Sequence, residues 1–497
     1  MKDRDVKVPS NLDAGQKVEI DEQQKFELFE LEAVEKQNVF DEVKLKRILR
    51  KVDVRIIPTM MVLYFLAYLD RSNIGNARLA NYEADLNLNE DHFYWSLQVF
   101  YFGYSLCEIP ANYMLKKLRP SRWIGLIMLL WGITSTCLAA CWNFGSLFSA
   151  RLLLGIFEAG LFPGIVFYLS FWYSKKEMAF RMALFYSGMS MSGLLGGLIA
   201  FGVMRIEGHL RAWQYLYIIE GVPTILVGAL TFFLLPDYPE TAKFLTEEER
   251  NFLVARLRHE NNSDTGTEVQ HDHRKMILEA FKEPRTYLFA IACIAYSLPG
   301  VALNLFLPTI VKALGHSDVK AQAMAAAPYA PAAVCSVLFA FFSDKFTQRA
   351  YFLMLVAGLA VVGFLLQLVL VSPDAQYGAM FLVAIGLWSM APLCMAWVAT
   401  NFAPAMKRGI ATAFIIACGN LVSSFGSQMY RNDDKPRFVR ANSINLAICA
   451  VLFISCGILR WHLAAENKKR DKMLAEGKYD PNRTADHDRD PVYRFTL

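Results

Sequence analysis

The stretch LAYLDRSNIGNARLA, residues 66–80, ends the first long apolar run of the chain, which begins at Arg55. It contains an acid and a base, Asp70 and Arg71, next to each other. A membrane-spanning helix needs about 20 residues, so a span that begins at Arg55 includes both charges. Each charge inside a membrane costs about 2.5 to 3.5 kcal/mol on insertion scales, and such residues are usually paired and functional. We therefore expect other spans to supply partners for Asp70 and Arg71.

The composition indicates a membrane protein with many spans. Of 497 residues, 55% are hydrophobic and only 20% are charged, whereas a soluble domain of this length carries more charge. The net charge of +5 is small and spread along the loops, so no nucleic-acid partner is predicted. Nine cysteines lie in apolar segments without a CxxC pair, which favours packing over disulfides or a metal site. We predict no metal and no cofactor.

Apolar segments recur along the chain and predict an all-α polytopic membrane protein with 12 transmembrane helices in two six-helix halves. Six spans, a polar loop and six more spans are typical of a transporter built from two halves. The spans are predicted near residues 56–77, 93–115, 122–142, 147–172, 180–204, 212–236, 285–312, 321–342, 350–371, 377–399, 408–429 and 441–463.

The distribution of charge predicts the domain organisation and the topology. Lys and Arg gather after spans two and four and in the central loop, which places both termini and this loop in the cytosol. The charged amino terminus lacks the apolar core of a cleavable signal peptide. The predicted parts are a cytosolic N-terminal tail with an amphipathic helix (1–54), a first half (55–236), a cytosolic central loop (237–284), a second half (285–463) and a cytosolic C-terminal tail (464–497).

Two segments leave alternatives open, and a third departs from the charge rule. The basic amphipathic pattern over residues 43–54 fits a helix on the membrane surface and equally a solvated helix. The loop after span eleven breaks the charge rule, because it contains Arg431, Lys435, Arg437 and Arg440 at the predicted outer side. The small residues from Ser187 to Gly197 in span five fit a sliding surface between the halves or simple tight packing.

Span four contains a second acid and base, Arg151 and Glu158. They are seven residues apart and share one helix face, but a separation of about 10.5 Å along the axis is too long for a pair. Each therefore needs a partner from another helix, and Asp70 and Arg71 are the candidates. An anion that takes over Arg71 would leave a carboxylate without its partner, and that carboxylate would then favour protonation. Anion binding and proton binding would thus promote each other.

Other polar residues inside the spans are weaker candidates, with core packing as the alternative for the uncharged ones. Glu108 fits a helix end beside the basic loop. Glu220 fits a structural partner of Arg205 or Arg211, with a role in substrate binding as the alternative. Asp344, Lys345 and Arg349 follow span eight, where charged pairs could hold one conformation closed. The uncharged candidates of the second half are Asn304, Trp388, Ser389, Trp397, Thr400, Asn420 and Ser423.

Five motifs follow one another along the chain, namely LDRSNIGNA (69–77), RLLLGIFEAGLFPG (151–164), WQYLYIIEG (213–221), LPDYPETAKFLTEEER (235–250) and FLPTIVKALG (306–315). In this order they resemble the anion:cation symporter family of the major facilitator superfamily, and most closely its fungal branch of allantoate, nicotinate, pantothenate and biotin permeases. The resemblance covers about residues 45 to 465. One departure is KKLRPSR (116–122), which has Lys where the family's loop motif has Asp, whereas Asp344 is kept in the second copy.

The resemblance implies the major facilitator fold and proton-coupled symport of a small organic carboxylate, such as nicotinate, pantothenate or an allantoate-like nitrogen source. It implies that Arg71 binds the substrate carboxylate. The proton-coupling residues would be Asp70, Glu158 and Arg151. Our predicted substrate-binding residues are Arg71, Tyr68, Asn73, Tyr104, Trp397 and Asn420.

Two alternatives keep the same fold: a nutrient sensor that does not transport, and an exporter of organic anions. An enzyme is not predicted, because no P-loop, nucleophile set or HExxH site occurs. The predicted partners are a small organic anion, a proton and membrane lipid. We predict a monomer in the plasma membrane, with the endoplasmic reticulum and the vacuolar membrane as alternatives.

Overall fold

The computed structural model describes residues 22–173, 175–264, 273–403, 405–476 and 493–497. The chain divides into two compact units, residues 1–52 and 53–497. The regular structure of the described residues is helical, which confirms the all-α class. Residues 43–54 are helical as predicted, but whether they contact a membrane stays a prediction. The predicted domain boundaries also stay predictions.

The first half of the chain contains the six predicted spans as long helices or helix pairs. Proline begins α4, where its missing N–H would be unbonded in any case, and Asn89 caps the start of α3 through its side chain. The helices are α1 (Glu22–Arg78), α2 (Tyr82–Asp85), α3 (Glu90–Lys117), α4 (Pro120–Cys137), η1 (Leu138–Ala140), α5 (Phe144–Glu158), α6 (Leu161–Leu169), α7 (Lys175–Val203) and α8 (Ala212–Leu234).

The second half follows the central segment and has the same number of spans. Proline again begins α11 and α15. The central helices are η2 (Pro239–Thr241), α9 (Glu247–Asp264) and α10 (His273–Lys282). The second half has α11 (Pro284–Ala313), α12 (Asp318–Ala326), α13 (Tyr329–Phe346), α14 (Arg349–Val369), α15 (Pro373–Thr400), α16 (Ala405–Ser423), η3 (Ser424–Gln428), η4 (Asn432–Asp434) and α17 (Val439–Ala475).

Eleven helical segments of the described residues are long and apolar enough to cross a membrane, and they coincide with eleven predicted spans. The remaining span, predicted at 93–115, is the 28-residue helix α3. It is less apolar because it contains Gln98, Glu108, Asn112 and four tyrosines. α3 packs against α5 and α16, so polar side chains on it can face protein instead of lipid.

Two spans are each built from two helices with a break between them. α5 ends at Glu158 and α6 begins at Leu161, with Pro163 in the first turn of α6. α12 and α13 are separated in the same way at Pro328. Proline lacks the main-chain N–H that would continue the helical hydrogen bonds. The first break leaves Glu158 at the end of α5.

Helix pairs hold each half together. α4 packs along α8 and α3 along α5 in the first half, while α14 packs along α15 and α17 in the second. Glycine permits the closest approach of α3 and α5, because a Cβ at Gly155 would lie 2.1 Å from the main-chain oxygen of Phe100. Such contacts between backbones are what small residues in membrane helices allow.

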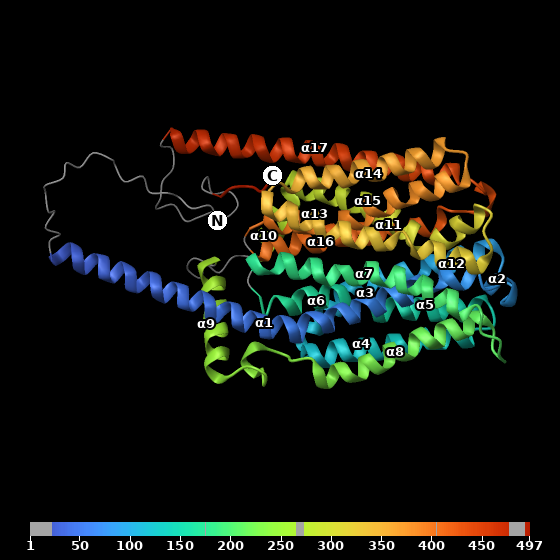
Figure 1. Cartoon of the computed structure of the whole chain (residues 1–497), viewed down its shortest axis with the longest axis horizontal. Coiled ribbons are helices and arrows are strands. Elements are labelled where there is room, and N and C mark those ends of the chain that lie inside the picture. Colours follow the sequence, from blue (N-terminus) through green and yellow to red (C-terminus); the bar gives the residue numbers. More distant parts are fainter. Residues whose placement is uncertain (1–21, 174, 265–272, 404, 477–492) are drawn as a thin grey trace, which may run out of the picture. The chain divides into compact units, whose positions relative to one another are not determined.

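The two halves contact each other along α7. In Figure 1 the helices of the first half (blue to green) lie together, and those of the second half (yellow to red) lie beside them. α7 packs against α12 and α13. In the predicted glycine cluster of span five, Gly193 and Gly197 face Tyr329 and Ala326 of the second half, whereas Gly188 faces Met61 of α1. The cluster therefore forms part of the surface between the halves and also packs tightly within the first half.

Residues 493–497, the C-terminal segment, bind to one end of the second half. The Tyr493 hydroxyl donates to the main-chain oxygen of Thr400 at 2.8 Å. The main-chain N–H of Phe495 donates to Asn467, and Asn467 donates back to the main-chain oxygen of Phe495, both at 2.9 Å. The Phe495 ring is buried, and the guanidinium groups of Arg285 and Arg470 lie 4.3 Å and 4.1 Å from its centre. The segment is thus bonded to α15 and α17 and stacked on α11.

Replacing Gly155 by Ala should destabilise the first half, because the added methyl group meets the backbone of α3. Overpacking of this kind typically costs about 1–3 kcal/mol. We expect a lower apparent melting temperature for purified Gly155→Ala in detergent. Gly202→Ala in α7 is the matched control, since its Cβ would meet no atom within 4 Å. Equal melting temperatures for the two variants would contradict this description of the α3–α5 contact.

Candidate functional site

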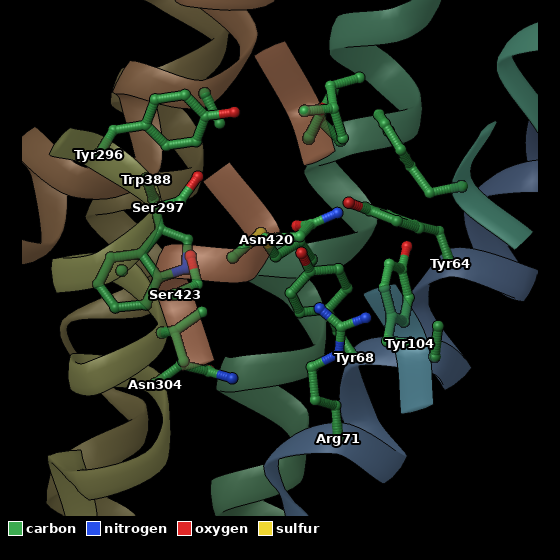
Figure 2. A pocket seen from close by; sticks show the side chains of 18 of the residues that line it. Tyr64, Tyr68, Arg71, Tyr104, Tyr296, Ser297, Asn304, Trp388, Asn420 and Ser423 are labelled. Atoms are coloured by element: carbon green, nitrogen blue, oxygen red, sulfur yellow. The ribbon is translucent and has the colours of Figure 1, made fainter. Parts of the chain in front are cut away.

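A cavity of about 110 Å³ lies between the two halves. The first half lines it from α1, α3, α5, α6 and α7, and the second half from α11, α15 and α16. Figure 2 shows Tyr68, Arg71 and Tyr104 on one side, with Asn304 and Trp388 on the other. A site at the interface of two repeats is where transporters built from halves bind their substrates.

Arg71 and Glu158 are the two charged side chains among the described residues that line the cavity, and they form an ion pair. Glu158 is buried, and the Arg71 side chain is 12% exposed. The Arg71 guanidinium also lies 4.8 Å from the ring centre of Tyr68 and 5.3 Å from that of Tyr104. Such cation–π contacts help to hold a cation in an interior with little water.

The spacing of residues on α1 brings these side chains together. Tyr64, Tyr68 and Arg71 follow one another at intervals of four and three residues and all line the cavity, as residues on one helix face do. Asp70 directly precedes Arg71, so its side chain points about 100° away around the helix. The acid and the base in the motif therefore lie on different faces of α1.

Other spans supply the hydrogen-bond partners of Asp70, as we expected from the sequence. Its carboxylate accepts hydrogen bonds from the Ser135 hydroxyl at 2.6 Å and the Thr224 hydroxyl at 3.1 Å. Asp70 is fully buried and does not line the cavity. It lies on the face of α1 that packs inside the first half, next to α4 and α8.

Arg151 and Asn73 also lie outside the cavity lining. Arg151 is buried and its Nε donates to the main-chain oxygen of Ser96 at 3.5 Å. Arg151 lies close enough to Glu158 for their charges to interact, but no ion pair joins the two among the described residues. Asn73 is fully buried on the inner face of α1. Its predicted role in substrate binding is therefore not supported by its position.

Four of the second-half candidates line the cavity, namely Asn304, Trp388, Asn420 and Ser423. The Tyr329 hydroxyl donates to Asn304 at 3.0 Å. Asn420 donates to Glu108 of the first half at 3.3 Å, so Glu108 contacts the other half. Ser389, Trp397 and Thr400 do not line the cavity.

Trp397 is the clearest departure from the prediction. Its indole N–H donates to the main-chain oxygen of Thr496 at 2.9 Å, so it binds the C-terminal segment and not a cavity ligand. The sequence could not indicate this, because the partner lies 99 residues away along the chain.

The predicted gating residues lie together beside the C-terminal segment. Arg349 and Asp344 form an ion pair at 2.9 Å, and the main-chain N–H of Arg349 donates to the main-chain oxygen of Leu497 at 2.7 Å. Lys345 is exposed. The Asp344–Arg349 pair belongs to the second half alone and does not join the halves. A gating role for these three residues stays a prediction.

The sequence prediction missed several aromatic residues of the cavity. Tyr64, Tyr101, Tyr186 and Tyr296 contribute rings and hydroxyl groups to its lining. One signal was available for Tyr64, because it lies seven residues before Arg71 on the same helix face. Tyr186 and Tyr296 come from other helices, and the sequence alone does not say which of their faces meets α1.

Comparison with known proteins identifies the family. Residues 60–427 match the family model of the Major Facilitator Superfamily.

The chain belongs to the major facilitator superfamily.

Fungal superfamily members cover almost the whole chain. The MFS transporter prlL of a fungal species is 36% identical over 84% of this chain and 86% of its own length. The MFS-type transporter cnsO of Penicillium expansum is 34% identical over 93% of this chain and 92% of its own. The solved structure of the proton:xylose symporter XylE matches 82% of this chain and 96% of its own with a TM-score of 0.66 at 16% identity, which shows the fold alone. The chain is thus a membrane transporter of this superfamily and not an enzyme, as predicted.

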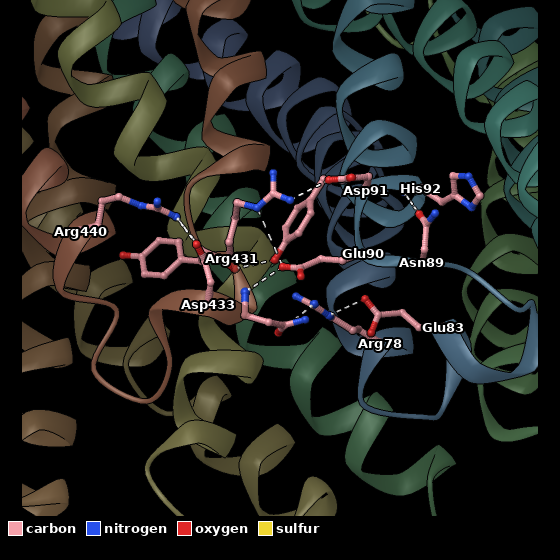
Figure 3. Close-up of polar contacts among 12 residues, drawn as sticks. Arg78, Glu83, Asn89, Glu90, Asp91, His92, Arg431, Asp433 and Arg440 are labelled. Atoms are coloured by element: carbon pink, nitrogen blue, oxygen red, sulfur yellow. Dashed lines mark hydrogen bonds and ion pairs between the residues drawn. The ribbon is translucent and has the colours of Figure 1, made fainter.

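In a transporter of this superfamily, the contacts between the halves show which side of the cavity is closed. Figure 3 shows contacts at the predicted outer end, where α1 and α3 meet the loop after α16. Arg431 pairs with Asp91 at 2.6 Å, and the main-chain N–H of Asn432 donates to Glu90 at 2.9 Å. Two further bonds lie nearer to the cavity: Tyr94 donates to the main-chain oxygen of Tyr430 at 2.8 Å, and Gln428 donates to Gln98 at 2.9 Å.

These contacts explain the basic loop that broke the charge rule. Asp91 raises the pKa of Arg431 through a hydrogen bond, so the guanidinium stays charged. Arg440 pairs with Asp433 at 3.2 Å, and Arg437 donates to the main-chain oxygens of Leu368 and Leu370. The arginines of this loop thus bind groups of the protein. Arg431 and the Asn432 N–H bind the acids Asp91 and Glu90, and the Asn432 side chain accepts a hydrogen bond from Arg78. An exposed ion pair contributes only about 0–1 kcal/mol, so the buried Tyr94 bond should matter more for closure.

Replacing Tyr94 by Phe should open the outer end of the cavity. The change leaves the buried carbonyl of Tyr430 without its donor, which costs about 1–3 kcal/mol and is equivalent to about a fivefold to hundredfold population shift. We expect a cysteine placed at Gly300, which lines the cavity and has free space for a Cβ, to react correspondingly faster with an impermeant thiol reagent added outside. Rates are corrected for the native cysteines.

Tyr377→Phe is the matched control for that experiment. Its hydroxyl donates to the main-chain oxygen of Met324 at 2.8 Å, so it loses the same kind of bond, but within the second half. The reaction rate at position 300 should stay at the wild-type value in this control. Equal rates for both variants would show that the Tyr94 bond does not hold the outer end closed.

Proposed function

We propose that this transporter carries out proton-coupled symport of a small organic carboxylate. The observation that carries the proposal is the Arg71–Glu158 pair, which places one cation and one titratable acid in a cavity lined by both halves. Arginine suits a carboxylate ligand because its planar fork can donate two parallel hydrogen bonds. The motif resemblance to fungal permeases of the anion:cation symporter family supports the same substrate class.

The pair gives a physical reason for coupling. In the empty cavity Arg71 and Glu158 neutralise each other. A carboxylate that binds Arg71 displaces Glu158, and a buried carboxylate without a partner costs several kcal/mol. Protonation of Glu158 removes this cost, so the loaded cavity is again neutral. A cavity with only the anion or only the proton contains an unpaired charge, and it should change conformation less readily than the empty or fully loaded one.

The remaining cavity residues would orient the substrate. Tyr68 and Tyr104 hold the Arg71 guanidinium between aromatic rings. Asn304 and Asn420 lie on the second half and can bond to polar groups of a ligand. A cavity of about 110 Å³ favours a small solute. Nicotinate, pantothenate and allantoate are the candidates to test, with the plasma membrane as the proposed location.

Uptake by cells that express the full chain tests the proposal. Labelled nicotinate, pantothenate, allantoate and other small carboxylates are supplied at acidic and at neutral external pH. We expect at least one to accumulate faster at acidic pH. Arg71→Gln should weaken uptake about tenfold to a hundredfold, because a charged hydrogen bond contributes about 1.5–3 kcal/mol. Arg205→Gln, which removes an exposed cation outside the cavity, should leave uptake unchanged.

Glu158→Gln separates coupling from binding. Gln resembles a protonated Glu, so exchange of labelled for unlabelled substrate across the membrane should continue. Accumulation driven by a pH gradient should be lost. If pH-driven accumulation persists in Glu158→Gln, then Glu158 is not the coupling residue. If wild type takes up no carboxylate at either pH, the substrate class is wrong.

A further inference from the structure

A second group of buried polar side chains lies within the first half, at the junction of α1, α4 and α8. Asp70 comes from α1, Ser135 from α4 and Thr224 from α8, and they are joined by the two hydrogen bonds that Asp70 accepts. The Thr224 hydroxyl also lies 3.2 Å from the main-chain oxygen of Glu220, one turn earlier on α8. A hydroxyl has one proton, so it can donate to only one of these two acceptors at a time.

Glu220 has an unusual environment for a carboxylate. Its exposed fraction is 1%, and neither carboxylate oxygen accepts a hydrogen bond of normal geometry among the described residues. The uncharged Asn73 amide of α1 lies nearby. The basic residues suggested as its partners lie elsewhere: Arg211 pairs with Asp85 at 2.7 Å, and Arg205 stacks on Phe201 at 4.1 Å. A buried ionised carboxylate without donors is not tolerated, and such a group takes up a proton instead.

The neighbours of Glu220 favour the same outcome. The charge of Asp70 acts on Glu220, and two acids in one dry site cannot both be ionised. Glu158 at the end of α5 also acts on Asp70. From α4 the neighbouring polar groups are Ser135 and the Trp131 indole, which are uncharged and lie next to Asp70. Arg151 of α5 acts on the Tyr217 hydroxyl, one turn before Glu220, and not on Glu220 itself.

We propose that Asp70 and Glu220 form a buried acid pair that binds one proton, at a site separate from the cavity. Asp70 accepts from the Ser135 hydroxyl and can also accept from the shared Thr224 hydroxyl, so it can hold the negative charge. Glu220 has only the Asn73 amide nearby and accepts no hydrogen bond of normal geometry among the described residues, so the proton resides on Glu220. Neither residue lines the cavity, whereas Arg71 and Glu158 do. The transporter thus has two places for a proton: one that a substrate can reach, and one that it cannot.

The proton on this pair can respond to events in the cavity because α1 connects the two sites. Asp70 and Arg71 are adjacent, so a rotation or shift of α1 as an anion engages Arg71 also changes the hydrogen bonds of Asp70. This use in coupling rests on the proposed function. The binding of a proton by the acid pair does not rest on it.

Infrared difference spectroscopy of the purified full-length protein tests the pair directly. The probe is pH alone, and the measured signal is the C=O stretch of a protonated carboxyl group, compared between neutral and alkaline pH. We expect a band in the wild type at neutral pH that is missing in Glu220→Gln. Gln has the shape of a protonated Glu, so this variant should fold. Glu207→Gln, which changes an exposed acid, is the control and should keep the band.

Asp70→Asn is the second variant. Removing the neighbouring negative charge should let Glu220 ionise more easily, so the band should titrate about one pH unit or more lower than in the wild type. A Glu220→Gln spectrum that equals the wild-type spectrum overturns the proposal, and so does an unmoved titration in Asp70→Asn. Because neither measurement uses a substrate, a failure of the uptake experiment would refute the proposed function and leave this result standing.

Discussion

The ion pair between Arg71 and Glu158 is the interaction on which the site depends. It joins α1 to the end of α5 and places both charges of the cavity lining within one contact. An arginine buried in a membrane helix is expensive unless it is paired. The structure meets this requirement with one acid and a set of aromatic rings around the guanidinium. Any ligand that binds Arg71 must therefore compete with Glu158.

The α1 helix directs two adjacent charged residues, Asp70 and Arg71, to different faces. Arg71 faces the cavity with Tyr64 and Tyr68, whereas Asp70 faces hydroxyl groups of α4 and α8. This separation follows from helical geometry, since neighbouring side chains point about 100° apart. The result is that one half of the transporter has a charged site open to the cavity and a second polar site sealed inside its own helices.

The sequence predicts the fold well because the relevant signal is local. Runs of apolar residues locate the spans, and among the described helices α3 is the predicted span that falls short, because Gln98, Glu108, Asn112 and four tyrosines make it more polar. The pairing of Arg71 with Glu158 could also be predicted from the sequence. Span length places both charges in the membrane, and helix spacing rules out Arg151 as the partner of Glu158. The partners of Asp70 and Trp397 could not be predicted. Those of Asp70 depend on which helices pack together, and that of Trp397 depends on the position of the C-terminal segment. The same is true of Tyr186 and Tyr296, whose place in the cavity depends on the approach of the two halves.

The C-terminal segment has a consequence for the movement of the halves. Its hydrogen bonds reach Thr400, Asn401 and Asn467, and its buried ring stacks on Arg285, all of which belong to the second half. If the halves rock as rigid bodies, this short peptide moves with the second half throughout the transport cycle. It ties the ends of α11, α15 and α17 into a single block, so this end of the second half should move as one piece.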